Sequence, residues 1–154
     1  MDPFDVKILN IVQRDNRLST EKIGHQVGLS PSAVQRRLKR LHEEGIIEAD
    51  VAIISPDAVE RRLTAIVEVT LEREHLLSSV LDEFKKLMLA TPAVVQCYHV
   101  TGDADFILIV TMKDMQEYEA FTRRFFIENR SVRRFQTSVV VSRVKSGTIV
   151  PLIL

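Results

Sequence analysis

The sequence predicts an α+β protein with an N-terminal helix-turn-helix domain and a C-terminal ferredoxin-like β-α-β-β-α-β sandwich. Two observations lead to this fold class. Apolar residues recur every three to four positions from Asp5 to Glu44, as in amphipathic helices. From Leu63 onward, runs rich in β-branched residues alternate with two further helical stretches. We therefore assign residues 1–50 to the helical domain, 51–62 to a strand and linker, and 63–154 to the sandwich.

Three short helices are expected in the N-terminal part. The first spans Asp5 to Val12, the second begins at Ser19 or Thr20 and ends at Gly28, and the third follows Ser30-Pro31 and ends at Gly45. Serine is a preferred N-cap, proline is tolerated at the first helical position, and glycine ends helices because it readily adopts the left-handed conformation. Short strands over 46–47 and 51–54 are expected to follow and to make the domain a winged one.

The C-terminal part is expected to contain four strands and two helices. We predict strands over 63–71, 93–101, 105–112 and 132–144, a helix over 74–90, and a second helix from Asp114 to about Asn129. This topology leaves one face of the sheet without helices. A second subunit would cover that face, because burial of apolar surface is worth about 25 cal/mol per Å². We therefore expect a homodimer.

Basic residues gather on one side of the third helix, opposite its apolar stripe. The residues of this side, with the capping serine, are Ser30, Ser32, Gln35, Arg36, Lys39 and Arg40. Residues at the start of such a helix reach base edges in the major groove, so we expect Ser32, Gln35 and Arg36 to read double-stranded DNA. Lys39 and Arg40 would contact phosphates. The alternative is an ordinary solvated face, which the absence of acids between Ser30 and His42 disfavours. Arg37 lies nearer the core, where we expect an ion pair, with Asp5 as a candidate partner.

Together these features resemble the leucine-responsive regulatory protein (Lrp/AsnC) family over nearly the whole chain. The segments that carry the resemblance are Asp2-Pro-Phe-Asp-Val-Lys-Ile-Leu9, Gly28-Leu-Ser-Pro-Ser32, Arg37-Leu-Lys-Arg-Leu41 with Gly45-Ile-Ile47, Val100-Thr-Gly-Asp-Ala-Asp-Phe106 and Val144-Lys145. The resemblance implies a transcription regulator that forms homodimers and often tetramers or octamers. It also implies that the C-terminal domain senses amino acids or related metabolites at subunit interfaces. Phe135 departs from the pattern, since it occupies a stretch that is often polar in members that bind an amino acid.

The turn Gly102-Asp103-Ala104-Asp105 is the candidate ligand site. By itself it is an ordinary hairpin turn. Its backbone N–H groups are also suited to a ligand carboxylate, and its two aspartates to an ammonium group. The alternative is an acidic ligand, which would suit the arginines nearby in the sequence, namely Arg123, Arg124, Arg133 and Arg134. With the resemblance, we expect an effector-binding set of Tyr98, Gly102, Asp103, Ala104, Asp105, Thr137 and Ser138.

Composition restricts the other function classes. Cys97 is the only cysteine, so an intramolecular disulfide and a multi-cysteine zinc site are excluded. Cys97 and His99 share one face of a strand and are expected to pack there rather than to bind a metal. We expect no metal, no cofactor and no membrane span, and the N-terminus has acids where a signal peptide needs basic residues, so a cytoplasmic protein is expected. No nucleophile with a matching base is apparent, so we expect no enzyme. Two alternatives remain open: an architectural DNA-binding protein without an effector, and an enzyme similar to the siroheme decarboxylases that resemble this family.

Overall fold

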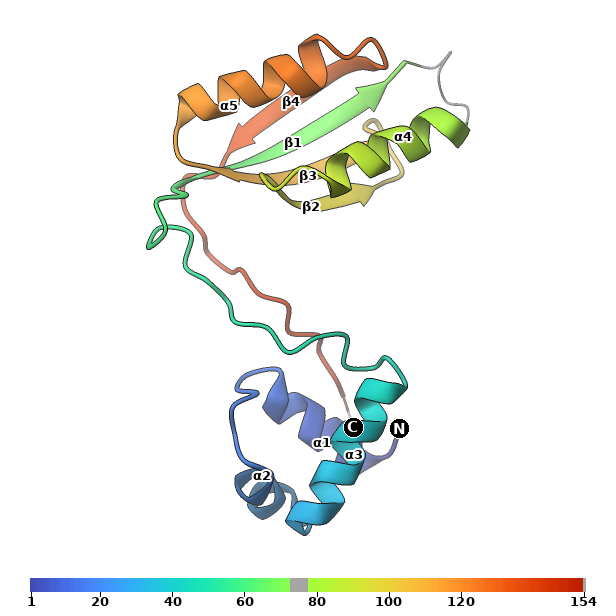
Figure 1. The fold of residues 1–154 in the computed structure, drawn as a ribbon, viewed down its shortest axis with the longest axis vertical. Helices are drawn as coiled ribbons and strands as arrows, with labels where there is room; N and C mark the ends of the chain where they lie inside the picture. Colours follow the sequence, from blue (N-terminus) through green and yellow to red (C-terminus); the bar gives the residue numbers. More distant parts are fainter. Residues whose placement is uncertain (73–77, 154) are drawn as a thin grey trace. The chain divides into compact units, whose positions relative to one another are not determined.

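The computed structural model describes residues 1–72 and 78–153, which form two compact units (Figure 1). The first unit consists of residues 1–53 together with 144–153, and the second of residues 54–143. Each unit has its own hydrophobic core. The predicted start of a helix at Glu74 lies outside the described residues.

The first unit contains the three predicted helices, α1 (Pro3–Val12), α2 (Thr20–Val27) and α3 (Pro31–Glu43). The side chains of Asp2, Ser19 and Ser30 cap their N-termini by accepting hydrogen bonds from backbone N–H groups of the first turn. The core of this unit is formed by apolar residues from all three helices, namely Ile8, Ile23, Val27 and Val34. The helix-turn-helix prediction is therefore confirmed.

Two glycines shape the turn between α2 and α3. Gly28 ends α2 in the left-handed conformation at φ +76°, as its position in the sequence predicted. Gly24 has a different role, because a Cβ atom there would lie 2.4 Å from the carbonyl oxygen of Leu29. The turn can pack this closely against α2 only because position 24 has no side chain.

The strands predicted over 46–47 and 51–54 are absent, and this prediction was wrong for the chain by itself. A strand requires a neighbour whose backbone groups it can pair with. Among the described residues, nothing pairs with this segment. Its apolar side chains remain exposed, with Val51 at 70% and Ile53 at 84%.

Residues 144–153 belong to the first unit because they dock on α1. The side-chain amide of Gln13 forms two hydrogen bonds with the backbone of Val150: it donates to the carbonyl at 3.1 Å and accepts from the N–H at 2.7 Å. One helical turn earlier, Asn10 donates to the carbonyl of Leu152 at 3.3 Å. Two amide side chains of α1 therefore bind this extended segment much as a neighbouring strand would.

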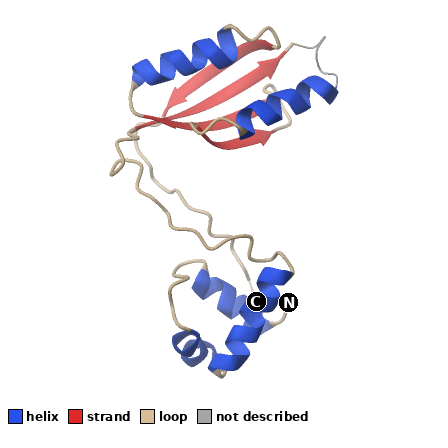
Figure 2. Cartoon of the chain, in the orientation of Figure 1, coloured by secondary structure: helices blue, strands red, loops and turns tan. Residues whose placement is uncertain are grey.

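The second unit is the predicted ferredoxin-like sandwich. Its elements are β1 (Leu63–Leu71), α4 (Ser78–Leu89), β2 (Val94–His99), β3 (Phe106–Met112), α5 (Met115–Thr122), the π-helix η2 (Arg123–Ile127) and β4 (Val132–Val139). The strands are antiparallel in the order β2-β3-β1-β4. Both α-helices pack on the same face (Figure 2), where Phe84 and Met88 of α4 and Phe121 of α5 meet buried strand residues such as Phe106.

The last strand is shorter than predicted, ending at Val139 rather than at Val144. Val139 pairs with Ala65, close to the start of β1 at Leu63, and one further hydrogen bond joins the Val140 N–H to the Thr64 carbonyl. Beyond this point the partner strand has ended, so the β-branched residues that follow have no strand beside them. Among the described residues, no helix is both long and apolar enough to cross a membrane.

Candidate functional site

The polar side of α3 is exposed as predicted. Ser32, Gln35, Arg36, Lys39 and Arg40 are all exposed, whereas Val34 and Leu41 on the opposite side are fully buried. The Ser30 hydroxyl accepts from the N–H of Ala33 at 3.3 Å and lies 3.2 Å from the Ser32 hydroxyl. Ser30 therefore fixes the start of α3, the end that enters a DNA groove in helix-turn-helix proteins.

A buried carboxylate of α1 binds two arginines of α3. Asp5 is 0% exposed, and its two oxygens accept from Arg37 at 2.7 Å and from Arg40 at 2.6 Å. The Asp2 N–H donates to the same carboxylate at 2.9 Å, and Arg37 also reaches the Asp2 carboxylate at 2.7 Å. The predicted ion pair between Arg37 and Asp5 is thus confirmed. The bond from Arg40 to Asp5 was not predicted.

These hydrogen bonds keep Asp5 ionised. Burial acts to raise the pKa of the Asp5 carboxyl, but the hydrogen bonds from Asp2, Arg37 and Arg40 outweigh it and lower that pKa from 3.8 to about 2. The same contacts with Asp2 and Asp5 raise the pKa of Arg37. The charges at this junction of α1 and α3 therefore stay fixed throughout the neutral range.

Arg36 differs from the other basic residues of α3. Lys39 lies 3.7 Å from Glu43, and Arg40 lies 3.9 Å from Glu44 in addition to its bond with Asp5. Within the described residues, Arg36 is the one Lys or Arg of α3 with no carboxylate oxygen within 4 Å. It lines a small recess of about 220 Å³ together with Asp2, Arg37 and Arg40. Its guanidinium is thus available to a partner outside the chain.

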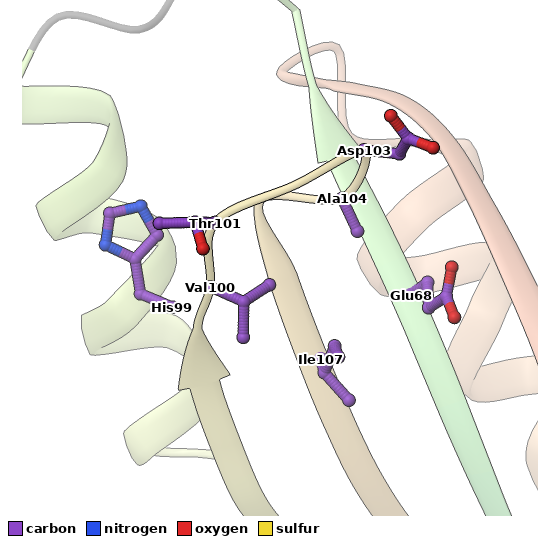
Figure 3. Close-up of a pocket in the computed structure, with 7 residues that line it drawn as sticks. All are labelled: Glu68, His99, Val100, Thr101, Asp103, Ala104 and Ile107. Atoms are coloured by element: carbon purple, nitrogen blue, oxygen red, sulfur yellow. The ribbon is translucent and has the colours of Figure 1, made fainter.

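A second feature lies on the sheet face of the other unit that carries no helices. It is an open hollow of about 600 Å³, lined by Glu68, His99, Val100, Thr101, Asp103, Ala104 and Ile107 (Figure 3). Glu68 and Ile107 pair directly across β1 and β3, so both side chains point to this face. The His99 ring points away from it and stacks on Phe106 at 4.9 Å, on the helix side. His99 thus packs against Phe106 as predicted but remains exposed, whereas Cys97 is half-buried against the core of the second unit.

The predicted ligand residues do not all meet at this hollow. Asp103 and Ala104 line it, and Gly102 turns the chain beside it at φ +121°. The Asp105 carboxylate instead accepts from the Leu71 N–H at 2.7 Å and so holds the turn against β1. Tyr98 faces the same side as the hollow, opposite Ile107, but lies outside its lining.

Thr137 and Ser138 face opposite sides of the sheet, so their predicted joint role is corrected. Thr137 pairs with the buried Val67, and its hydroxyl is hydrogen-bonded to that of Tyr118 on the helix side. Burial raises the pKa of Tyr118, which stays protonated. Ser138 pairs with Ile66 on the bare face, outside the lining of the hollow. Adjacent residues of a strand alternate between faces, so only one of the two can contribute to a pocket.

Several residues of the hollow were missed by the sequence analysis, among them Glu68, Thr101 and Ile107. Alternation along each strand shows which residues share a face, but the pairing of β1 with β3 cannot be read from either strand alone. Arg134 pairs with Thr70 on this face and donates to its hydroxyl at 3.5 Å. Thr70 in turn donates to the Asp103 carbonyl at 3.4 Å, so Arg134 is linked to the turn.

Comparisons with known proteins agree with this architecture. The family model for the AsnC-type helix-turn-helix domain matches residues 1–42, and that for the Lrp/AsnC ligand binding domain matches residues 64–150. An HTH-type transcriptional regulator of Sinorhizobium fredii is 56% identical over 99% of this chain and 89% of its own length. The leucine-responsive regulatory protein of Escherichia coli K12 is 30% identical over 96% of this chain and 88% of its own length.

Two solved structures share the fold at 30% sequence identity. One is a transcriptional regulator from Neisseria meningitidis in complex with L-methionine, with a TM-score of 0.92, covering 98% of this chain and 96% of its own. The other is an AsnC family regulator from Agrobacterium tumefaciens, with a TM-score of 0.91, covering 98% of this chain and 97% of its own. With its basic α3 and its ferredoxin-like sheet domain, this chain belongs to the Lrp/AsnC family of DNA-binding transcription regulators.

Proposed function

We propose that this regulator reads its operator with the start of α3. The observation that carries the proposal is Arg36, which is exposed and has no carboxylate within 4 Å in the described residues. A free guanidinium makes two hydrogen bonds to a guanine edge, and the amide of Gln35 is suited to adenine. Ser32 completes the reading set. Lys39 and Arg40 contact phosphates and set the position of the helix on the duplex.

Binding as a homodimer follows from the second unit. Its bare sheet face carries apolar side chains of three strands, including Ile66, Ile109 and Tyr98, and Tyr98 is 51% exposed. A second copy buries this surface and places two α3 helices on one duplex. The operator is then a pseudo-palindrome whose half-sites are about 10 bp apart, or a multiple of that. Tetramers or octamers would be assembled from such dimers.

Substitution of Arg36 and Lys39 tests these roles. Arg36→Ala is expected to weaken operator binding by about 1–3 kcal/mol and to relax discrimination at one base pair. Lys39→Ala is expected to weaken operator and random DNA alike and to reduce the salt dependence by about one phosphate. Quantitative footprinting over a salt series measures both effects. Equal losses on operator and random DNA for both variants would contradict the division, and a monomer on one isolated half-site would contradict the dimer.

The second part of the proposal is that an amino acid binds at the hollow beside Gly102. The carboxylates of Glu68 and Asp103 suit an ammonium group, and the backbone N–H groups of the turn, with Arg134 nearby, suit a carboxylate. Ile107 and Ala104 offer apolar contacts to a ligand side chain. The methionine complex of the Neisseria relative supports this ligand class.

The hollow is open in a single chain, so the second subunit supplies the missing wall. A ligand bound there favours the assembly in which its surroundings fit best. It changes DNA binding only if its affinity differs between two assemblies or two arrangements of the DNA-binding units. This requirement distinguishes a sensor from an architectural protein that ignores metabolites.

Calorimetry with the twenty amino acids, alongside operator binding, tests the ligand site. Asp103→Ala is expected to abolish the response and to leave operator binding without ligand unchanged. Asp82→Ala removes an exposed carboxylate of α4, and this control is expected to respond normally. Asp105→Ala is a less specific test of ligand binding, because it also removes the hydrogen bond from the Leu71 N–H that holds the turn. Absence of heat from every amino acid would contradict the ligand class, and a response that survives Asp103→Ala would contradict the site.

A further inference from the structure

We propose that Asp5 is a positioning residue that sets the specificity of DNA binding by restraining Arg40. Asp5 does not reach DNA itself. It limits the orientations of a guanidinium that contacts phosphate, so that this contact forms only when α3 is in register with its operator. The inference rests on the proposed contact of α3 with DNA and adds a residue of α1 to it.

The Asp5 carboxylate is held rigidly. It is 0% exposed and lies in the first turn of α1, where its side chain and that of Asp2 each accept a hydrogen bond from the other's backbone N–H at 2.9 Å. Its oxygens also accept from Arg37 and Arg40. A carboxylate with three donors and no solvent around it cannot follow an arginine that turns toward DNA.

Arg40 is the partner through which Asp5 acts. Arg37 is only 21% exposed and also pairs with Asp2, so it stays in place without Asp5. Arg40 is 44% exposed, and its other acidic neighbour, Glu44, is an exposed side chain 3.9 Å away. Asp5 is therefore the one rigid restraint on Arg40 among the described residues, at 2.6 Å.

The restraint on Arg40 has different effects on the binding of operator DNA and of random DNA. On random DNA, the protein slides over phosphates in many registers, and a freely rotating arginine finds a phosphate in each of them. An arginine whose guanidinium is hydrogen-bonded to a buried carboxylate can contact a phosphate only at one position relative to α3. The operator complex has a fixed register, so the restrained guanidinium retains its contact there.

Salt titrations of Asp5→Asn on operator and random duplexes of equal length test this proposal, with the operator taken from footprinting. Asparagine keeps the shape but removes the charge that restrains Arg40. On random DNA, affinity is expected to rise several-fold and the salt slope to steepen by about 0.9, the value for one added phosphate contact. The ratio of operator to random affinity is expected to fall several-fold. A purely structural Asp5 would lower both affinities in proportion, with an unchanged slope.

Two variants provide the controls. Asp2→Asn removes the other acid of the network, which pairs with Arg37 and caps α1, and the salt slope on random DNA is expected to stay unchanged. In an Arg40→Gln background, Asp5→Asn is expected to have no effect on that slope. An equal effect of Asp5→Asn with and without Arg40 would overturn the proposal.

Arg40→Gln alone keeps the proposal testable if Asp5→Asn fails to fold. With Asp5 present, Arg40 contributes little on random DNA, so Arg40→Gln is expected to weaken operator binding several-fold without changing the random-DNA slope. A slope that falls by about 0.9 on random DNA would overturn the proposal, because Arg40 would already be free there. Loss of operator recognition in the unsubstituted protein would instead count against the proposed function.

Discussion

The proposed sites of the two units differ in how many of their charged side chains have ion-pair partners in the same chain. Along α3, the side chains of Arg37, Lys39 and Arg40 have carboxylate partners in the same chain, whereas Arg36 has none among the described residues. The buried Asp5 carboxylate receives three hydrogen bonds. At the hollow of the second unit, the carboxylates of Glu68 and Asp103 form no ion pair with any described residue. The surface proposed to read DNA is thus held in place by groups of its own chain, whereas the proposed ligand site is an open hollow.

The ligands proposed for the two sites account for this difference. A DNA groove is large and its shape is constant, so a helix whose side chains are fixed in advance loses little conformational entropy on binding. A metabolite must be enclosed to be distinguished from its analogues, and a flat sheet face cannot enclose it alone. Four substitutions or conditions, taken from the largest expected effect to the smallest, probe this contrast between the units.

Removal of a core aromatic should have the largest effect, because it should lower the stability of the second unit and leave that of the first unit unchanged. Phe106 is 0% exposed and lies between the rings of Phe84 at 4.7 Å and His99 at 4.9 Å. Phe106→Ala is expected to destabilise the second unit by about 3–5 kcal/mol. Calorimetric unfolding is expected to show the transition of the second unit shifted and that of the first unit unchanged. Equal shifts of both would mean that the units unfold as one.

Acid should destabilise the first unit through Asp5. Its pKa in the folded protein is about 2, below the ordinary 3.8, so its stabilisation is complete above pH 3.8 and is lost as the pH falls through about 2. The contribution is about 2 kcal/mol. Denaturant unfolding of the protein and of Asp5→Asn measures it. The difference between the two is expected to narrow from pH 4 to pH 2, and a constant difference would contradict the role of the charge.

Loss of the hydroxyl pair between Tyr118 and Thr137 should have a moderate effect on the second unit. Tyr118→Phe removes one partner of a hydrogen bond on the helix side of the sheet and is expected to cost about 1 kcal/mol. Ligand affinity is expected to stay unchanged, because this pair lies on the face opposite the hollow. Reduced affinity in calorimetry would mean that the helix side contributes to the site after all.

Neutralisation of Glu68 should affect binding but hardly affect stability. The side chain is exposed on the bare face, so Glu68→Gln is expected to change the free energy of unfolding by less than about 0.5 kcal/mol. The same substitution is expected to weaken binding of a ligand with an ammonium group. Unfolding and calorimetry on one sample measure both, and a large loss of stability would show that Glu68 has a structural role.

Local features of this molecule could be predicted from the sequence, and pairings between distant segments could not. The cap at Ser30, the left-handed Gly28 and the start of a helix at Asp114 depend on a few neighbouring residues, and all three are observed. The length of the last strand depends on where β1 begins, so it was predicted wrongly.

The candidate sites show the same division. Helical periodicity identified the exposed side of α3, because one helix determines it. The restraint of Arg40 depends on α1 lying against α3, and the lining of the hollow depends on the register between β1 and β3. Arg37 was matched to Asp5 because its projection placed it at the core margin. Arg40 projects to the solvent side, and only the structure shows that its long side chain reaches back to the same carboxylate.

The docking of residues 144–153 on α1 has a consequence for how the chain connects its two units. Because this segment returns to the first unit after β4, the two units are joined by two covalent crossings of the backbone instead of one. The last strand of the sheet and the hydrogen bonds to Asn10 and Gln13 thus belong to one continuous stretch of backbone, with no helix or strand between them in the described residues.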